Sequence, residues 1–382
     1  MSQFELIATA AFGLESLVAE ELRDLGYTEL KVENGKVTFR GDEQAICRTN
    51  LWLRQAERIL VQIGQFGACT FEELFERTKA LPWDEWLPAE ACFPVQGKSI
   101  KSTLFSVSDC QAIVKKAVVE KMKEKYKINW FEENGPTYPI EVGLLKDLVT
   151  LTIDTSGAGL HKRGYRKLVS RAPLRETLAA AMISLSRWQA ERVFIDPFCG
   201  AGTIPIEAAL QGLNIAPGLK RKFMAEEWSN LPPRLWEEAR LEAHDLIRQD
   251  VTLDLAGFDY DKEVLSLARY HAREAGVEKY IHFQERSFTD LSTKKKYGYI
   301  ICNPPYGQRL EEKSAVERLY REMGHVLGKL ETWSFYVLTS SPDFEKLFGR
   351  PANKNRKLYN GMIKCYYYQF FGPKPPRQKS QI

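Results

Sequence analysis

The stretch Asp196-Pro-Phe-Cys-Gly-Ala-Gly-Thr203 lies between an apolar segment at 193–195 and a helical pattern at about 204–212. Its glycines let the backbone approach a ligand closely at a strand-to-helix turn. A Gly-x-Gly pair alone is as typical of a simple tight turn. The acid that opens the loop is more informative, because Asp196 would repel a phosphate group and suits the ammonium of a methionine moiety. The loop is therefore predicted to hold a nucleoside cofactor, with Pro197, Phe198 and both glycines, Gly200 and Gly202, around it.

The second half of the chain alternates strand and helix patterns, as a doubly wound α/β domain does. Apolar strand candidates lie at 193–195, 255–258, 281–284, 299–302, 335–338 and 364–371. Helical patterns lie at about 204–212, 261–275, 315–330 and 342–348. In this architecture the loops after the carboxyl ends of the strands surround the ligand, so further polar residues are expected after the later strands.

The loop after the strand at 255–258 begins with Asp259-Tyr260-Asp261. Asp259 is placed to accept hydrogen bonds from both hydroxyls of a ribose. Asp261 has a competing explanation as the N-cap of the next helix. We therefore assign Asp259 to the cofactor, with Tyr260 beside it.

The loop after the strand at 299–302 is Asn303-Pro-Pro-Tyr306-Gly307. A purine's exocyclic amine is a poor nucleophile, so a site must accept its N–H groups and orient its nitrogen. The Asn303 side-chain oxygen and the Pro304 carbonyl are two acceptors, the prolines (Pro304, Pro305) stiffen the loop, and Tyr306 can stack on a base that has left its helix. No separate protein nucleophile is needed. Cys199, inside the cofactor loop, is expected to pack as a small hydrophobe, and Cys302 is expected in the strand core.

Bulk composition indicates an ordinary globular protein. Of 382 residues, 44% are hydrophobic and 27% charged, and no apolar run approaches the roughly 20 residues that span a bilayer. The amino terminus does not have the pattern of a signal peptide. The seven cysteines are odd in number and never spaced as CxxC, which argues against a disulfide framework or a zinc site and favours a reducing cytoplasm.

The net charge of +4 is too small to indicate a nucleic-acid partner, but basic residues cluster at 96–127 and 161–175. Such clusters suit phosphate binding, although a single charge run is more often a solvated helix surface. The candidate RNA-binding residues are Lys98, Lys101, Lys115, Lys116, Lys162, Arg163 and Arg166.

The first half suggests two smaller α+β domains. Residues 1–64 show a β-α-β-β-α-β order with an Asn34-Gly35 hairpin turn, which is ferredoxin-like. Residues 65–160 contain an amphipathic helix, for which Ser108 and Gln111 form a possible capping box, and a strand at 149–153. Residues 161–372 form the doubly wound domain, which contains an insertion with tryptophans at 214–254, and 373–382 form a tail.

Several of these motifs resemble one family, the THUMP-containing RNA methylases, and within it the ribosomal guanine-N2 methyltransferases of the RlmL N-terminal-half or YpsC-like type. The resemblance rests on Leu160-His-Lys-Arg-Gly-Tyr-Arg166, Ala172-Pro-Leu-Arg-Glu-Thr-Leu178 and Lys357-Leu-Tyr-Asn-Gly361, together with the loops at 196–203 and 303–307.

The resemblance implies a ferredoxin-like start, a THUMP domain that grips RNA, and a class I methyltransferase domain that holds S-adenosylmethionine. It also implies N2-methylguanosine in 23S ribosomal RNA, or in a large-subunit precursor, as the product. Asp196, Phe198, Gly200 and Gly202 would then surround the methionine part of the cofactor, and Asp259 would bind its ribose. Residues 303–306 would hold the target base, and Thr203 and Asn303 would also lie next to the cofactor. One departure is Ser287, followed by Phe288, where relatives usually offer the adenine an acid.

Other functions remain compatible with the sequence. A transfer-RNA guanine-N2 methyltransferase would share both the THUMP domain and the Asn-Pro-Pro-Tyr loop. DNA adenine-N6 methylation uses a similar loop but does not explain an RNA-binding domain. An inactive RNA-binding assembly factor would fail to bind S-adenosylmethionine. A nicotinamide oxidoreductase is disfavoured because the third glycine of its phosphate loop is missing.

Overall fold

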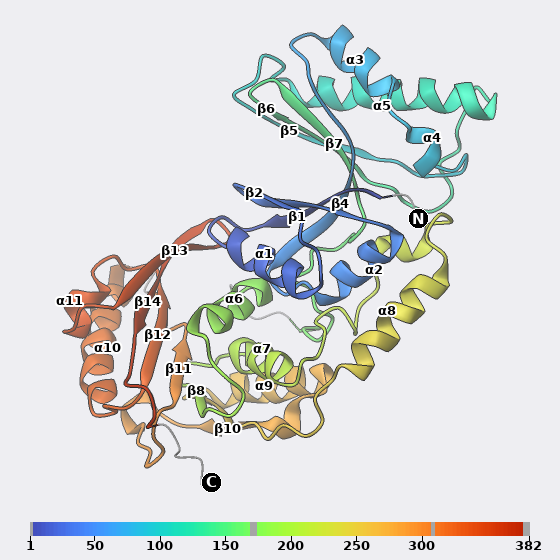
Figure 1. The fold of residues 1–382 in the computed structure, drawn as a ribbon. Coiled ribbons are helices and arrows are strands. Elements are labelled where there is room, and N and C mark those ends of the chain that lie inside the picture. Colours follow the sequence, from blue (N-terminus) through green and yellow to red (C-terminus); the bar gives the residue numbers. More distant parts are fainter. Residues whose placement is uncertain (1–2, 169–173, 307–309, 377–382) are drawn as a thin grey trace. The chain divides into compact units, whose positions relative to one another are not determined.

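The computed structural model of the chain describes residues 3–168, 174–306 and 310–376 (Figure 1). Its internal contacts divide the chain into two compact units. Unit 1 comprises Met1–Ala10, Val18–Leu160 and Arg221–Glu242, and unit 2 comprises Ala11–Leu17, His161–Lys220 and Ala243–Ile382. Across the described residues, no helix is long and apolar enough to cross a membrane.

The first part of unit 1 has the predicted ferredoxin-like order. Its elements are β1 (Phe4–Ala10), α1 (Glu15–Asp24), β2 (Leu30–Glu33), β3 (Lys36–Gly41), α2 (Glu43–Trp52) and β4 (Ala56–Gly67). The strands lie in the order β2-β3-β1-β4. The β2–β3 turn needs a left-handed residue, which Gly35 supplies with φ of +78°.

The second part of unit 1 extends the same sheet. Its elements are α3 (Phe71–Lys79), α4 (Trp83–Trp86), β5 (Val95–Ile100), α5 (Val107–Tyr126), β6 (Ile140–Leu145) and β7 (Leu148–Asp154). Strand β7 pairs with β4, which gives seven strands in the order β2-β3-β1-β4-β7-β6-β5. The sequence predicted neither β5 nor β6. The predicted capping box is wrong, because α5 begins at Val107 with Ser106 at its N-cap and Ser108 already inside the helix.

The tryptophan-containing insertion forms η1 (Met224–Glu227) and α8 (Pro233–Asp245). Residues Arg221–Glu242 pack within unit 1, whereas the segments on either side of them belong to unit 2. The buried Trp228 ring stacks on Tyr138 with centroids 4.5 Å apart, and its indole N–H donates to the Thr137 carbonyl at 2.9 Å. The insertion is therefore a structural part of the N-terminal unit.

Unit 2 contains the doubly wound sheet. Its elements are α6 (Glu176–Ser186), β8 (Phe194–Asp196), α7 (Thr203–Gly212), β9 (Leu255–Asp259), α9 (Lys262–Ala275), η2 (Glu278–Tyr280), β10 (Ile281–Glu285), η3 (Phe288–Asp290), β11 (Tyr299–Cys302), α10 (Leu310–Gly328), β12 (Ser334–Thr339), α11 (Phe344–Phe348), β13 (Lys354–Asn360) and β14 (Ile363–Phe370). The strand order is β10-β9-β8-β11-β12-β14-β13. The first five strands are parallel, whereas β14 and β13 are antiparallel additions.

Both faces of this sheet are covered, which explains why its central strands are apolar throughout. On β11, Ile301 packs in the cluster that includes side chains of α6, α7 and α9. Its neighbours Ile300 and Cys302 point to the opposite cluster, which includes Tyr320 and Met323 of α10. These two layers hold the sheet in place, and the candidate site lies at the carboxyl ends of its strands.

Candidate active site

Three candidate side chains lie at one edge of the unit 2 sheet. Asp196 is the last residue of β8, Asp259 is the last residue of β9, and Asn303 directly follows β11. Strand β8 lies between the parallel strands β9 and β11, so their carboxyl ends meet at the same edge. The chain reverses its strand order there, and such a switch point is where doubly wound sheets bind ligands.

Among the described residues, no cation pairs with the Asp196 carboxylate. Its carboxylate is buried, with Oδ1 accepting the Phe198 N–H at 3.0 Å, while Oδ2 is buried without a hydrogen-bond partner among the described residues. Burial raises the pKa of Asp196 well above its ordinary value, and the nearby Asp259 raises that pKa further. A buried oxygen without a partner is costly, and an ammonium group would satisfy it. The Asp196 carboxylate thus fits the ammonium of the predicted methionine moiety.

The glycine loop is tied to the neighbouring strand. The Gly200 N–H donates to Asp259 Oδ2 at 3.0 Å, and the Asp261 N–H donates to Asp259 Oδ1 at 3.1 Å. Gly202 has φ of +82°, and a Cβ there would lie 3.0 Å from the Ala268 Cβ, so the position needs glycine. Asp259 is held in place by backbone donors while each carboxylate oxygen keeps further acceptor capacity.

Aromatic side chains flank this loop. Phe198 stacks on Phe288 with centroids 4.9 Å apart, and Tyr260, directly after Asp259, is 79% exposed. Flat apolar surfaces of this kind suit a nucleoside base. Ser287 is exposed, and its hydroxyl lies 2.8 Å from the Thr289 hydroxyl. Ser287 therefore offers the site a hydroxyl and no carboxylate.

The Asn-Pro-Pro-Tyr loop brings its two polar side chains together. The Tyr306 hydroxyl donates to Asn303 Oδ1, and the Cys365 thiol lies 3.6 Å from the Tyr306 hydroxyl oxygen. The Tyr306 ring is half-buried against the core, and this burial raises its pKa. Both predicted base-contacting side chains are therefore engaged with each other. Gly307 lies outside the described residues.

Tyr320, which the sequence analysis did not single out, supports the Asn-Pro-Pro-Tyr loop through a hydrogen bond. The Tyr320 hydroxyl on α10 donates to the Pro305 carbonyl at 3.0 Å and lies 2.7 Å from the Thr339 hydroxyl on β12. Tyr320 is fully buried, which raises its pKa to about 12. In the sequence it is one aromatic among the apolar positions of a helix, so no pattern separates it from ordinary core residues.

Two cysteines near the site are buried in the core. Cys199 and Cys302 are both buried, and burial raises each thiol pKa well above its ordinary value. A raised pKa disfavours the thiolate that would attack. Their predicted roles as packing residues are confirmed.

The basic segment at 161–168 corrects one prediction. Arg163 is only 3% exposed, and its guanidinium lies 3.4 Å from both Glu207 carboxylate oxygens, so it does not face RNA. Arg166 is half-buried and donates to the Leu174 carbonyl at 3.2 Å and to the Thr203 hydroxyl at the start of α7. Both arginines therefore contact α7, the helix that follows the glycine loop. Lys162 is exposed, and 169–173 lie outside the described residues.

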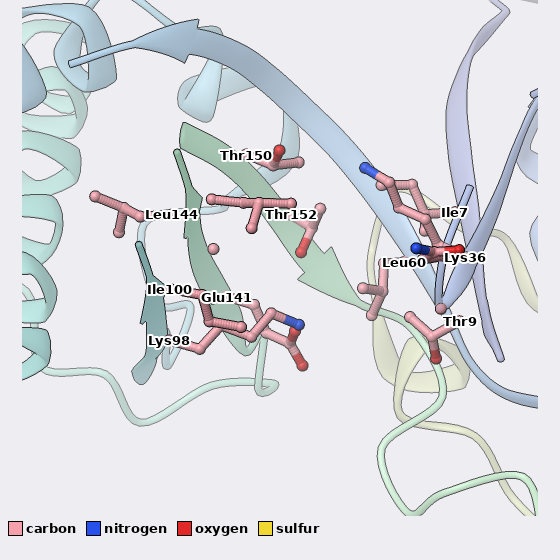
Figure 2. Close-up of a pocket in the computed structure, with 14 residues that line it drawn as sticks. Ile7, Thr9, Lys36, Leu60, Lys98, Ile100, Glu141, Leu144, Thr150 and Thr152 are labelled. Carbon is pink, nitrogen blue, oxygen red and sulfur yellow. The ribbon is translucent and has the colours of Figure 1, made fainter. Parts of the chain in front are cut away.

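The predicted lysines of unit 1 also divide into two kinds. Lys98, Lys101 and Lys116 are exposed. Lys115 instead pairs with Glu133 at 2.6 Å and lies over the Phe93 ring at 3.6 Å. Lys98 lines a hollow of about 290 Å³ on the sheet face, together with Ile100, Glu141, Ile7 and Leu60 (Figure 2).

Comparison with known families matches three segments of the chain. Residues 163–369 match the RMKL-like methyltransferase domain, residues 5–60 match the RlmL ferredoxin-like domain, and residues 68–154 match the THUMP domain.

Individual relatives match nearly the whole chain. "Putative RNA methyltransferase YpsC" of Bacillus subtilis is 52% identical over 381 residues, which cover 99% of each chain. A crystal structure from Listeria monocytogenes, described as a predicted N6-adenine-specific DNA methylase, is 53% identical with a TM-score of 0.94 and covers 98% of this chain and 97% of its own. SMU.472, a putative methyltransferase complexed with SAH, is 46% identical with a TM-score of 0.93, covering 98% of this chain and all of its own.

Proposed function

We propose a function from one premise: the chain belongs to the RMKL-like methyltransferase family, whose domain matches residues 163–369. It transfers a methyl group from S-adenosylmethionine to the exocyclic N2 of a guanine in 23S ribosomal RNA. The observation that carries this proposal is the shared carboxyl edge of β8, β9 and β11. There the Asp196 carboxylate, whose Oδ2 has no hydrogen-bond partner among the described residues, lies at the same edge as the amide of Asn303.

S-adenosylmethionine supplies an electrophilic methyl group on a sulfonium. Asp196 Oδ2 would hold its ammonium, and Asp259 would accept hydrogen bonds from the ribose hydroxyls. The turn at Gly200 and Gly202 leaves room for close backbone approach, and the Phe198–Phe288 stack with Tyr260 offers apolar surface to the adenine. The crystal structure of SMU.472 is a complex with SAH, which supports the same cofactor here.

The Asn303 side chain orients the base. Its Oδ1 is a strong acceptor for an amine N–H once the Tyr306 hydroxyl gives way, and acceptance turns the nitrogen lone pair away from the loop. The Tyr320 hydrogen bond to the Pro305 carbonyl fixes the loop that carries Asn303. The amine nitrogen would itself attack the methyl carbon, forming the N–C bond as the C–S bond breaks and then giving one proton to solvent. No protein nucleophile is therefore required.

The surface of unit 1 suits RNA. The tip of the β6–β7 hairpin and the loop after β5 expose Phe105, Leu145 and Ile100 at 82%, 55% and 52%, and the lysines Lys98, Lys101 and Lys146 are exposed around them. The Thr103 N–H donates to the Asp147 carboxylate at 2.6 Å, and the Asp147 N–H donates to the Ser102 hydroxyl at 3.1 Å, which holds hairpin and loop together. An aromatic ring among cations is typical of sites for unpaired nucleotides.

The purified chain with labelled S-adenosylmethionine tests this function. Its substrates would be total RNA and genomic DNA from a strain that lacks the gene, followed by size separation and digestion to nucleosides. Label as N2-methylguanosine in 23S RNA is expected. N2-methylguanosine in transfer RNA would show that the reaction is correct but that the substrate is transfer RNA. Label as N6-methyladenine in DNA would replace the proposal with the activity in the Listeria relative's name.

A further inference from the structure

A second cavity, of about 350 Å³, lies in unit 2 away from the candidate active site. Its walls come from the connection between α6 and β8, from the starts of β11 and β12, and from the segment after β14. Strands β8, β11 and β12 are parallel, so their amino ends share one edge of the sheet. Asp196 and Asn303 lie at the opposite, carboxyl edge, and the cavity is therefore a separate site.

Charge is the distinguishing property of this cavity. Arg187, Arg192 and Lys374 line it, and no aspartate or glutamate among the described residues does. None of these three cations forms an ion pair with any residue that the structure describes. Three cations gathered around one hollow repel one another, and a bound anion would relieve that repulsion.

The segment after β14 passes close to the start of β12 on its way to Lys374. A Cβ on Gly372 would lie 2.6 Å from the Trp333 carbonyl oxygen, so only glycine passes so close to the start of β12. The Gly372 N–H also donates to the Ser334 hydroxyl at 3.0 Å. These contacts fix Gly372, two residues before Lys374, which lines the cavity.

The remaining wall offers hydroxyls and rings. The Thr332 hydroxyl oxygen accepts the Tyr297 N–H at 3.2 Å, which leaves its own proton to donate to a ligand. Tyr299 stacks on Tyr336 with centroids 5.9 Å apart and planes 7° from parallel, so its ring is held in a fixed orientation. Cations with a hydroxyl donor suit a phosphate group, and the tyrosine rings suit a planar base.

We propose that this cavity binds the phosphate group of a nucleotide. Arg187 and Arg192 are its main ligands, and Lys374 is the third cation around it. The nucleotide is either one residue of an RNA strand or a free mononucleotide, because both present the same phosphate and base. The site takes no part in methyl transfer, and its test measures only the binding of ligands to the cavity.

The test compares two double variants of the full chain with the wild type. Arg187→Gln/Arg192→Gln removes two cavity cations, whereas Arg318→Gln/Lys329→Gln removes two exposed cations elsewhere in unit 2 as a matched control. The probes are a fluorescein-labelled single-stranded oligoribonucleotide, AMP and inorganic phosphate. Thermal unfolding and S-adenosylhomocysteine binding verify that both variants are folded.

The cavity variant is expected to bind the oligoribonucleotide about tenfold more weakly than the control, with a salt dependence reduced by about 0.7 in slope for each lost contact. That result assigns the RNA strand. Loss of AMP and phosphate binding with RNA binding intact would assign the free nucleotide instead. Equal binding of all three probes by both variants would overturn the proposal, whether or not the chain methylates RNA.

Discussion

The Tyr306 hydroxyl donates a hydrogen bond to Asn303 Oδ1, so the side chain assigned to the base amine already has a partner within its own loop. A base that enters the site must replace this hydrogen bond. If the Tyr306 ring leaves its half-buried place to stack on the base, the Asn303 oxygen is released by the same movement. Stacking and amine recognition are therefore coupled through one contact.

Substitution of Tyr306 tests this coupling. Tyr306→Phe keeps the ring and frees Asn303 Oδ1, so kcat/KM should stay within about threefold of wild type. Tyr306→Ala removes the stacking surface, worth about 1–3 kcal/mol, and should lower kcat/KM by about 10- to 100-fold. Steady-state methyl transfer measures both. If Tyr306→Phe is as impaired as Tyr306→Ala, the hydroxyl itself contributes to the reaction and the coupling is wrong.

Asn303→Ala should keep S-adenosylhomocysteine affinity but lower kcat by about 10²- to 10³-fold, because the amine loses an acceptor that orients it. Asn303→Asp retains an acceptor oxygen and serves as the control, with a smaller loss expected. Calorimetric binding and single-turnover rates separate the two effects. Unchanged turnover in the alanine variant would remove Asn303 from the reaction.

The buried Asp196 makes cofactor affinity depend on pH. Its pKa is raised in the free protein, so the carboxyl is neutral over a range above its ordinary pKa, whereas an ammonium favours the ionised form. S-adenosylhomocysteine affinity should therefore increase as pH rises through the Asp196 pKa and level off above it. Calorimetry from about pH 5 to about pH 7.5 would show the slope.

Asp196→Asn gives the matching control. It should bind S-adenosylhomocysteine more weakly and without that slope. Because a raised carboxyl pKa means that folding stability is lost as pH rises, the asparagine variant should also be more resistant to urea than wild type near neutral pH. A slope that persists in Asp196→Asn would assign the titration to another group.

The insertion should contribute to the stability of unit 1. Trp228→Ala removes a side chain that is 2% exposed and stacked on Tyr138, and about 3–5 kcal/mol of unfolding free energy should be lost. Trp130→Ala, at a residue 81% exposed, should change it by less than about 0.5 kcal/mol. Urea unfolding measures both. Equal stability of the two variants would mean that the insertion is dispensable for folding.

The local signals in the sequence were sufficient where a single turn or strand end decides the structure. Asn34-Gly35 predicts the first hairpin, and Asp261 caps α9 by accepting the Glu263 N–H at 2.8 Å. The loops at Asp196, Asp259 and Asn303 follow strands whose burial makes their pattern strong. Their meeting at one edge then follows from the parallel order of the sheet.

Long-range packing was not predictable in the same way. Arg163 has the charge of a phosphate ligand, but its partner Glu207 lies 44 residues along the chain. Trp228 and Tyr138 are 90 residues apart, so nothing near the insertion indicates which unit it joins. Strand β13 is polar because it lies at the sheet edge, and its sequence resembles a loop. Such features depend on contacts that periodicity does not record.

The central claim, methylation of guanine N2 in 23S RNA through Asn303, is tested most directly in the cell. A strain that lacks the gene would carry either the wild-type chain or Asn303→Ala, and purified 23S RNA would be digested and quantified for N2-methylguanosine by mass spectrometry. The wild-type chain should restore one modified guanosine that neither the deletion strain nor the Asn303→Ala strain contains. Equal N2-methylguanosine content in all three strains would contradict the account.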